Sequence, residues 1–471
     1  MNPHDEMKQL EQALEKIIAK AREFGLDFYD TYFEICPADI LYTFGAYGMP
    51  TRFTHWTFGK AYHKMKTQYD YNLGRIYEMV VNSNPCYAFL LEGNSLIQNK
   101  LIMAHVLAHC DFFKNNIYFK NTSRDMVESM AAAAERFRNY EFKYGLERVE
   151  KFIDAAISIQ EHIEPRLMVK EGRRKEQKNK QECTCKRPET PYDDLWSLDE
   201  VKIECTCPST RKFPQKPEKD IMLFVLQHSR ELEDWQRDIM SVIRQEMLYF
   251  WPQMETKIMN EGWATYWHLR IIREIDLNEA ETVEFAKMHS GIIQPSRFRL
   301  NPYILGLKIF EDIEKRWENP GQEEKKKYGR MGGEGKEKIF EVRTSENDVS
   351  FLRNYLTREL IEELDLYLYK KIGYDWKITD KEWEKVRDEL VNNLTNCGYP
   401  HIEVQDGDFN RRGELYLKHC HEGKELDVFY LEKTLPHVYT LWGKPVYLET
   451  MLDNKKVLFS YNGEKTGKKF I

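Results

Sequence analysis

The 471-residue sequence lacks any apolar run near the ~18 residues that a membrane span needs. It also lacks the basic start and apolar stretch of a secretory signal, because the first residues are polar and acidic. These absences predict a cytoplasmic protein with no membrane span. In that compartment the nine cysteines serve as thiols or metal ligands rather than disulfides.

An excess of positive charge is missing as well. Seventy Lys and Arg residues stand against 77 Asp and Glu residues, for a net charge of −7. A nucleic-acid binder needs a concentrated positive surface, so we expect no nucleic-acid partner. Aromatic residues make up 13% of the chain, which excludes a disordered protein. The length is that of about three ordinary domains, and the sequence does not indicate the oligomeric state.

The hydrophobic pattern predicts an α+β protein that is mainly α. We expect a large helical domain in two parts, a polar insertion between them, a mobile linker, and a small α+β C-terminal domain. In chain order, the predicted bounds are 1–169 for the first helical part, 170–219 for the insertion, 220–318 for the second helical part, 319–338 for the linker and 339–471 for the C-terminal domain.

Local signals place several elements within these regions. Ser95 and Gln98 form a capping-box pattern, which predicts that a helix begins there. Glycine and proline between residues 36 and 59 predict turns. Alternation of apolar and polar residues predicts three C-terminal strands, at 414–418, 445–449 and 456–460.

The most informative motif is a histidine pair in the apolar segment that begins at residue 101. His105 and His109 are four residues apart, so on a helix they project from one face, separated by about 40°. Two imidazoles at this spacing can chelate one cation, as in zinc-protease helices. The competing interpretation is that both are hydrogen-bonded inside an aromatic core.

A second helical segment offers a third ligand. Glu261 lies on an otherwise apolar helix face, where burying a carboxylate is costly unless it meets a cation or hydrogen-bond donors. Two His and one Glu with an open position form a catalytic zinc arrangement, so a divalent metal, zinc foremost, is the predicted cofactor. His268, two turns further on, could donate a hydrogen bond to a ligand, be a further ligand, or be a buried histidine bonded to a backbone carbonyl.

Two more residues are candidates for this site. His55 follows a turn-rich segment and is a fourth ligand, a substrate contact or part of a packed aromatic loop. Tyr303 follows a turn, and its hydroxyl could stabilise an oxyanion.

The sequence lacks the general base that a zinc hydrolase of this kind carries beside its first histidine. Zinc-protease helices carry Glu directly after the first His, and here that position is Val106, which cannot accept a proton. A base would have to come from elsewhere, with Asp111, Glu92 and Glu246 as candidates that the sequence does not rank.

The polar insertion contains two C-x-C pairs. Cys183 and Cys185 form the first, and Cys205 and Cys207 the second. Four thiolates in two close pairs could close a structural zinc site, and the alternative is plain surface thiols.

Long strings of this sequence resemble one family. The most specific are FGAYGMPTRFTHWTFGK (44–60), NSLIQNKLIMAHVLAHCDFFKNN (94–116), MLYFWPQMETKIMNEGWATYWH (247–268) and DGDFNRRGELYLKH (406–419). They resemble stage V sporulation protein R, the SpoVR family, over nearly the full chain. The resemblance implies a cytoplasmic bacterial protein needed to assemble the spore cortex, a peptidoglycan layer. The C-x-C pairs are not part of the family pattern.

The histidine pair and the NEGWA string are also similar to gluzincin-like metallopeptidases, a short similarity from which Val106 departs. Two hypotheses follow. The first is a non-catalytic cortex-assembly or regulatory factor on a metalloprotease-like scaffold, whose partners are sporulation or cell-wall assembly proteins. The second is a zinc-dependent hydrolase of the peptidase or amidase type. The missing base, normally worth ~10²–10⁴-fold in rate, favours the first.

Overall fold

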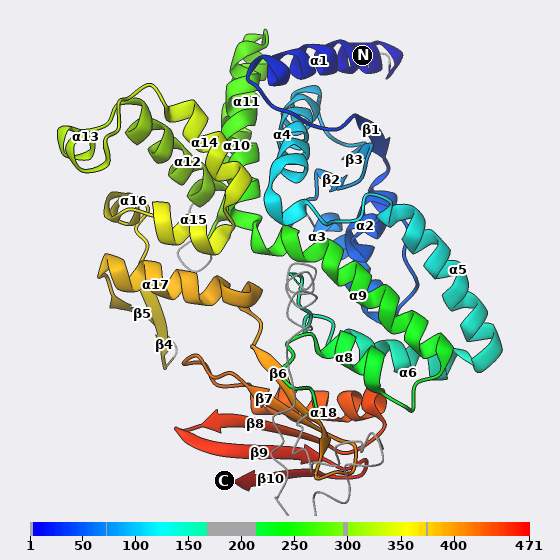
Figure 1. The fold of residues 1–471 in the computed structure, drawn as a ribbon. Helices are drawn as coiled ribbons and strands as arrows, with labels where there is room; N and C mark the ends of the chain where they lie inside the picture. The colour runs from blue at the N-terminus through cyan, green and yellow to red at the C-terminus, as the bar shows by residue number, and fades with distance from the viewer. Residues whose placement is uncertain (1–2, 72, 167–212, 295–299, 374) are drawn as a thin grey trace, which may run out of the picture. The chain divides into compact units, whose positions relative to one another are not determined.

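The computed structural model describes residues 3–71, 73–166, 213–294, 300–373 and 375–471. Within them the chain folds into two units, and each unit takes two separate segments of the sequence. Unit 1 contains residues 1–150 and 245–399, and unit 2 contains residues 151–244 and 400–471. The predicted class, α+β and mainly α, is confirmed (Figure 1). No described helix combines the length and apolarity that crossing a membrane requires.

Unit 1 is built mainly from helices. Its N-terminal segment contains α1 (Pro3–Glu23), β1 (Thr31–Cys36), α2 (Ala38–Tyr47), α3 (Trp56–Asp70), β2 (Glu78–Val81), β3 (Cys86–Leu91), α4 (Leu96–Asn115), the 3-10 helix η1 (Ile117–Phe119) and α5 (Met126–Tyr144). Its second segment contains α10 (Lys257–Glu274), α11 (Glu279–Ile292), α12 (Pro302–Glu318), α13 (Gln322–Tyr328), α14 (Gly335–Ser345), α15 (Asp348–Tyr355), α16 (Arg358–Glu363), β4 (Leu368–Ile372), β5 (Asp375–Asp380), α17 (Trp383–Leu394) and η3 (Thr395–Gly398).

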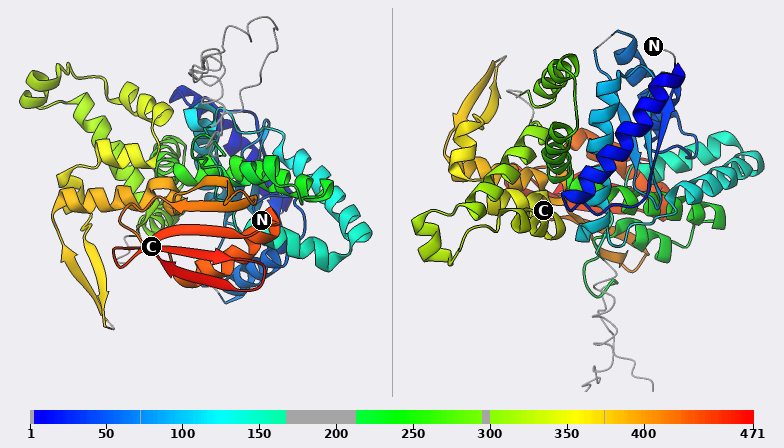
Figure 2. Two further views of the ribbon diagram at one scale, coloured as in Figure 1. Left: turned by 60° about the horizontal axis from the view of Figure 1, so that its bottom comes forward. Right: turned by 90° about the horizontal axis from the view of Figure 1, so that it is seen from above.

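Two long helices cross the boundaries of the units in sequence: α6 (Leu146–Ile157) and α9 (Asp234–Glu255). Unit 2 also contains α8 (Ile221–His228), β6 (Ile402–Phe409), β7 (Glu414–His419), α18 (Val428–Trp442), β8 (Val446–Leu452), β9 (Lys455–Tyr461) and β10 (Thr466–Phe470). Its five strands form one sheet in the order β10-β9-β8-β7-β6, which Figure 2 shows side by side. All neighbours are antiparallel except β7 and β8, which are parallel and joined through α18.

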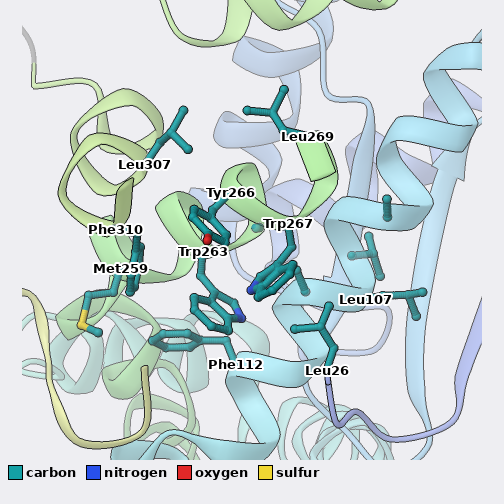
Figure 3. Packing of buried hydrophobic residues seen from close by; sticks show 14 of the residues in the cluster. Leu26, Leu107, Phe112, Met259, Trp263, Tyr266, Trp267, Leu269, Leu307 and Phe310 are labelled. Atoms are coloured by element: carbon teal, nitrogen blue, oxygen red, sulfur yellow. The ribbon is translucent and has the colours of Figure 1, made fainter. Parts of the chain in front are cut away.

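The core of unit 1 lies where α4, α10 and α12 pack together (Figure 3). Trp263 and Trp267 of α10 are buried, and the Trp263 ring lies 5.2 Å from that of Phe310 on α12. A side chain at Gly262 would overlap the backbone of Gly306, so this glycine pair lets α10 and α12 touch. Close packing of these three helices brings side chains that lie far apart in sequence into one place.

Most of the predicted local elements are present. Ser95 and Gln98 form both hydrogen bonds of a capping box at the start of α4, and strands β7, β8 and β9 occupy the predicted positions. The prediction of turns across residues 36–59 holds for 48–55, whereas α2 and α3 occupy most of the rest of the stretch. Gly48, at φ 77°, ends α2, so one glycine at a helix C-terminus was mistaken for part of a long loop.

The unit boundary in sequence lies at 399/400, whereas the predicted C-terminal domain begins at 339. Residues of α14 and α15, including Ile339 and Phe351, belong to the main hydrophobic core. The stretch 319–338, predicted as a linker, contains α13 and the start of α14. Most of the polar insertion at 170–219, including both C-x-C pairs, lies outside the described residues.

Candidate metal centre

Helix α4 carries the histidine pair through the middle of unit 1. It is buried on all sides from Leu101 to Phe113, as expected for a helix at the centre of a core. His105 and His109 are both buried in it. Buried polar side chains require partners, so what surrounds these two imidazoles indicates what they do.

Helix α10 approaches α4 and brings Glu261 to the pair. The carboxylate of Asp348, the first residue of α15, accepts hydrogen bonds from the Ile258 and Met259 amides at 2.8 and 2.9 Å. These bonds satisfy amides that a helix N-terminus leaves free. The start of α10, and with it Glu261, is thereby held in position.

The three predicted ligands converge. One ligand atom from each of His105, His109 and Glu261 lies within 4.8 Å of the others. Glu261 Oε2 is 3.6 Å from Nε2 of His105 and 3.6 Å from Nε2 of His109. The two Nε2 atoms are 3.0 Å apart. The geometric part of the sequence prediction, two imidazoles and a distant carboxylate in one place, is thus present in the fold.

These atoms fit a small divalent cation. Two ligands that are 2.0–2.1 Å from a tetrahedral metal lie about 3.3 Å from each other, which is close to the separations among these three groups. Glu261 Oε2 is buried and has no hydrogen-bond partner among the described residues. An unpaired buried carboxylate oxygen is costly, and a cation between the three side chains would satisfy it.

The far side of each imidazole is also occupied. His109 Nδ1 lies 2.8 Å from Oδ1 of Asn260, and His105 Nδ1 lies 3.0 Å from Nδ1 of His268. If each Nδ1 carries the hydrogen and donates it, each Nε2 keeps a lone pair facing Glu261. Metal-binding histidines are oriented in this way by outer partners. His268 thus contacts the predicted ligand His105.

Electrostatics favour the ligand forms of these groups. Burial, together with the charge of His105, lowers the pKa of His109 to about 4, so its imidazole is neutral near pH 7. Burial alone would raise the pKa of Glu261, but the nearby His105 and His109 side chains outweigh it and leave the pKa below its usual value. A neutral imidazole and a charged carboxylate are the forms that bind a cation.

Two further groups, Tyr303 and Glu78, interact electrostatically with Glu261. Tyr303, near the start of α12, places its ring 6.2 Å from that of His105. Burial and the carboxylates of Glu261 and Glu78 raise the pKa of the Tyr303 hydroxyl. Burial also raises the pKa of Glu78, the first residue of β2, with a further upward contribution from Glu261 and a downward one from His105.

The candidate bases Asp111 and Glu246 have structural partners instead. Asp111 is buried, with Oδ2 accepting from Trp263 Nε1 at 2.8 Å and Oδ1 from the Asp27 amide at 2.8 Å. Glu246 pairs with Arg52, whose Nη2 donates to it at 2.6 Å. Hydrogen bonds of this kind stabilise the fold, so these two carboxylates have a structural role.

Two other candidates lie elsewhere. His55 is the N-cap residue of α3, with Nδ1 2.7 Å from the Thr57 hydroxyl and its ring beside Phe58. It is not among the grouped ligands of the described chain. Glu92 is exposed.

Sequence reasoning missed Asn260 and Glu78. Asn260 directly precedes Glu261, so the neighbouring position in the same motif was the available signal. The sequence contained no such signal for Glu78, because this residue precedes His105 by 27 residues and lies on a separate short strand. Only the packing of β2 in unit 1 relates it to the helices.

The fold and site define a mainly α protein with a His/His/Glu cluster of the metal-ligand type, in which both histidines are buried. The model of the family described as "SpoVR like protein" matches residues 4–399, and that of the "SpoVR-like C-terminal domain" matches residues 400–453. The chain therefore belongs to the SpoVR family.

The chain is also similar to a protein of Escherichia coli (strain K12) named "Uncharacterized protein YcgB". The two are 28% identical over 474 residues, which covers 93% of this chain and 91% of the relative. No solved structure matches the chain. The junction between the two family models, at 399/400, coincides with the boundary between units 1 and 2.

Proposed function

We propose that this protein is a divalent-metal-dependent hydrolase of the SpoVR family, with His105, His109 and Glu261 as the metal ligands. The observation that carries the proposal is the convergence of these three groups around a buried Glu261 oxygen that lacks a hydrogen-bond partner. Zinc suits two imidazoles and one carboxylate with a position left open. When bound, the cation would supply Lewis-acid activation of water or of a substrate carbonyl.

The neighbouring side chains supply the proton chemistry in this proposal. The sequence offered no base, because Val106 occupies the usual position. The Glu78 carboxyl, whose pKa is raised by burial, would accept the proton of the attacking water. The Tyr303 hydroxyl, whose pKa is raised by burial and by Glu261, stays protonated and would donate a hydrogen bond to the oxyanion.

The family supports a role in sporulation. We propose that the protein acts in the cytoplasm during formation of the spore cortex, with a peptide or a peptidoglycan precursor as substrate. Partners would be sporulation or cell-wall assembly proteins. The competing function is a non-catalytic assembly or regulatory factor on a metalloprotease-like scaffold. The electrostatic interaction of Glu78 with His105 and Glu261 favours the hydrolase, because a carboxyl group there would supply the base whose absence weighed against that function.

Metal analysis of the purified full-length protein tests the proposal. To remove other thiolate ligands, it is done with C183S, C185S, C205S, C207S and C420S combined. We expect stoichiometric divalent metal in this background, near-complete loss with E261Q or H109A, and no change with E92Q, which alters an exposed glutamate.

Activity is then measured on short peptides and on peptidoglycan-precursor amides. Hydrolysis that E261Q abolishes and E92Q preserves would support the hydrolase. Absence of stoichiometric metal would refute the metal centre. Metal without turnover of either substrate class would leave the assembly factor as the better explanation.

A further inference from the structure

A second group of metal-ligand side chains lies at the edge of the C-terminal sheet, in unit 2. Strand β6 is the edge strand, and its antiparallel partner β7 pairs Ile402 with His419. The pairing extends one step further, because the Cys420 amide donates to the His401 carbonyl at 2.8 Å. His401 and Cys420 are therefore directly opposite each other.

Side chains of directly paired residues leave a sheet on the same face, and so do residues two apart on one strand. His401, Glu403 and Cys420 consequently share a face. Their ligand atoms all lie within 4.8 Å of one another, and His401 Nε2 is 3.2 Å from Glu403 Oε1. The partners of Cys420 in this group thus come from the opposite strand, β6.

One nitrogen of this group lacks a hydrogen bond. His401 Nε2 is buried and has no hydrogen-bond partner among the described residues, although the side chain as a whole is 31% exposed. The Glu403 side chain is 23% exposed, and Cys420 is also partly exposed. An unsatisfied nitrogen is thus directed at a carboxylate and a thiol, in a place that a cation can reach from solvent.

The nearby histidine His419 is not part of this group. It faces the other side of the sheet, where its Nδ1 lies 2.9 Å from the Thr450 hydroxyl of β8. Its side chain is buried. The group therefore has three protein donors, which leaves one position of a tetrahedral site open.

We propose that His401, Glu403 and Cys420 form a second metal site, for Zn²⁺ or a cation of similar preference. Imidazole nitrogen, carboxylate oxygen and thiolate sulfur are the three donor types that zinc accepts, and the mixed set disfavours Mg²⁺ and Ca²⁺, which prefer oxygen alone. Binding forms a metal–sulfur bond and releases the thiol proton of Cys420 to solvent. The cation would join the start of β6 to the end of β7.

This proposal does not depend on the hydrolase. The His105 centre belongs to unit 1 and contains no cysteine among its grouped ligands, whereas the second site belongs to unit 2 and contains a thiol. A probe that reports on sulfur ligation therefore separates the two sites. Cobalt(II) is such a probe, because thiolate coordination gives a charge-transfer absorption that nitrogen and oxygen ligands do not.

The experiment is a Co²⁺ titration of the full-length protein with C183S, C185S, C205S and C207S combined, so that the C-x-C pairs contribute no sulfur. We expect a thiolate-to-cobalt band that zinc displaces. C420S should abolish the band, and H401A should weaken cobalt binding at least about tenfold, the lower range for disturbing a metal site. C397S, which removes a partly exposed cysteine of unit 1, is the matched control and should leave the band unchanged.

The outcomes are distinct for the two sites. H109A should remove metal from unit 1 and leave the band intact. A band that survives C420S, or no band at saturating Co²⁺ in protein whose circular dichroism is native, would overturn the second site. Loss of the band in both C420S and C397S would also overturn it, because the sulfur ligand would then not be specific.

Discussion

At the scale of the residue, the surroundings of each carboxylate distinguish the candidate general bases, which the sequence could not rank. Asp111 and Glu246 are bound by Trp263 and Arg52 respectively, and so they hold the fold together. Glu78 instead interacts electrostatically with His105 and Glu261, two of the proposed ligands. A desolvated carboxyl beside a cation site can serve as a proton acceptor, because its raised pKa lies closer to neutral pH.

Replacement of Glu78 tests this role. E78Q keeps the size of the side chain and removes its ability to accept a proton. We expect the hydrolytic activity to fall about 10²–10⁴-fold, the usual contribution of a general base, with the metal content unchanged. E34Q alters an exposed glutamate of β1 in the same sheet and is the control. Full activity in E78Q, measured on the same substrate, would rule out this base.

At the scale of the element, α10 depends on a residue from a distant helix. Asp348 is buried and accepts from two amides at the start of α10. Burial raises its pKa from 3.8 to about 7, although the Ile258 and Met259 amides oppose the shift. The folded-state pKa lies above the unfolded value. The stability linked to this group is therefore fully present below the unfolded pKa and is lost as pH rises through about 7.

The variant D348N measures this linkage, because its side chain does not titrate. We expect the free energy of unfolding of the wild type relative to D348N to fall by about 1–3 kcal/mol between about pH 5 and about pH 8. Urea denaturation followed by tryptophan fluorescence gives both values. D375N changes an exposed aspartate of β5 and should show no such trend. A difference between wild type and D348N that is constant with pH would contradict the prediction.

At the scale of the whole molecule, the two units are interleaved in sequence. Unit 2 needs residues 151–244 as well as the C-terminal sheet. Within it, the ring of Phe224 on α8 stacks on Trp442 of α18 at 5.7 Å, and the Ser229 hydroxyl donates to the Trp442 carbonyl at 3.2 Å. The second family model, beginning at residue 400, thus covers only part of a structural unit.

A truncated chain tests this interdependence. Removing residues 400–471 deletes the buried Trp442 and the sheet on which α8 packs. Loss of one buried tryptophan side chain alone costs about 3–5 kcal/mol. We expect the 1–399 protein to be cleaved by trypsin within 213–244 under conditions in which the full-length protein resists there. Equal resistance of that segment in both proteins, mapped by mass spectrometry, would show that it folds without the sheet.

The sequence by itself determined what depends on near neighbours. Ser95 and Gln98 begin α4, the four-residue spacing places His105 and His109 on one face, and alternation marks the C-terminal strands. Helices and strands repeat within a few residues, so their period is visible in the residues themselves.

Tertiary structure alone decided which distant groups meet. Glu261 follows His109 by 152 positions in the chain, and Glu78 lies on strand β2 rather than on either helix. The same packing gives Asp111 and Glu246 their structural partners, Trp263 and Arg52. It also places His401 opposite Cys420, at the ends of the neighbouring strands β6 and β7. These contacts depend on how buried surfaces pack together over the whole chain. The short-range periodicity of the sequence contains no information about that packing.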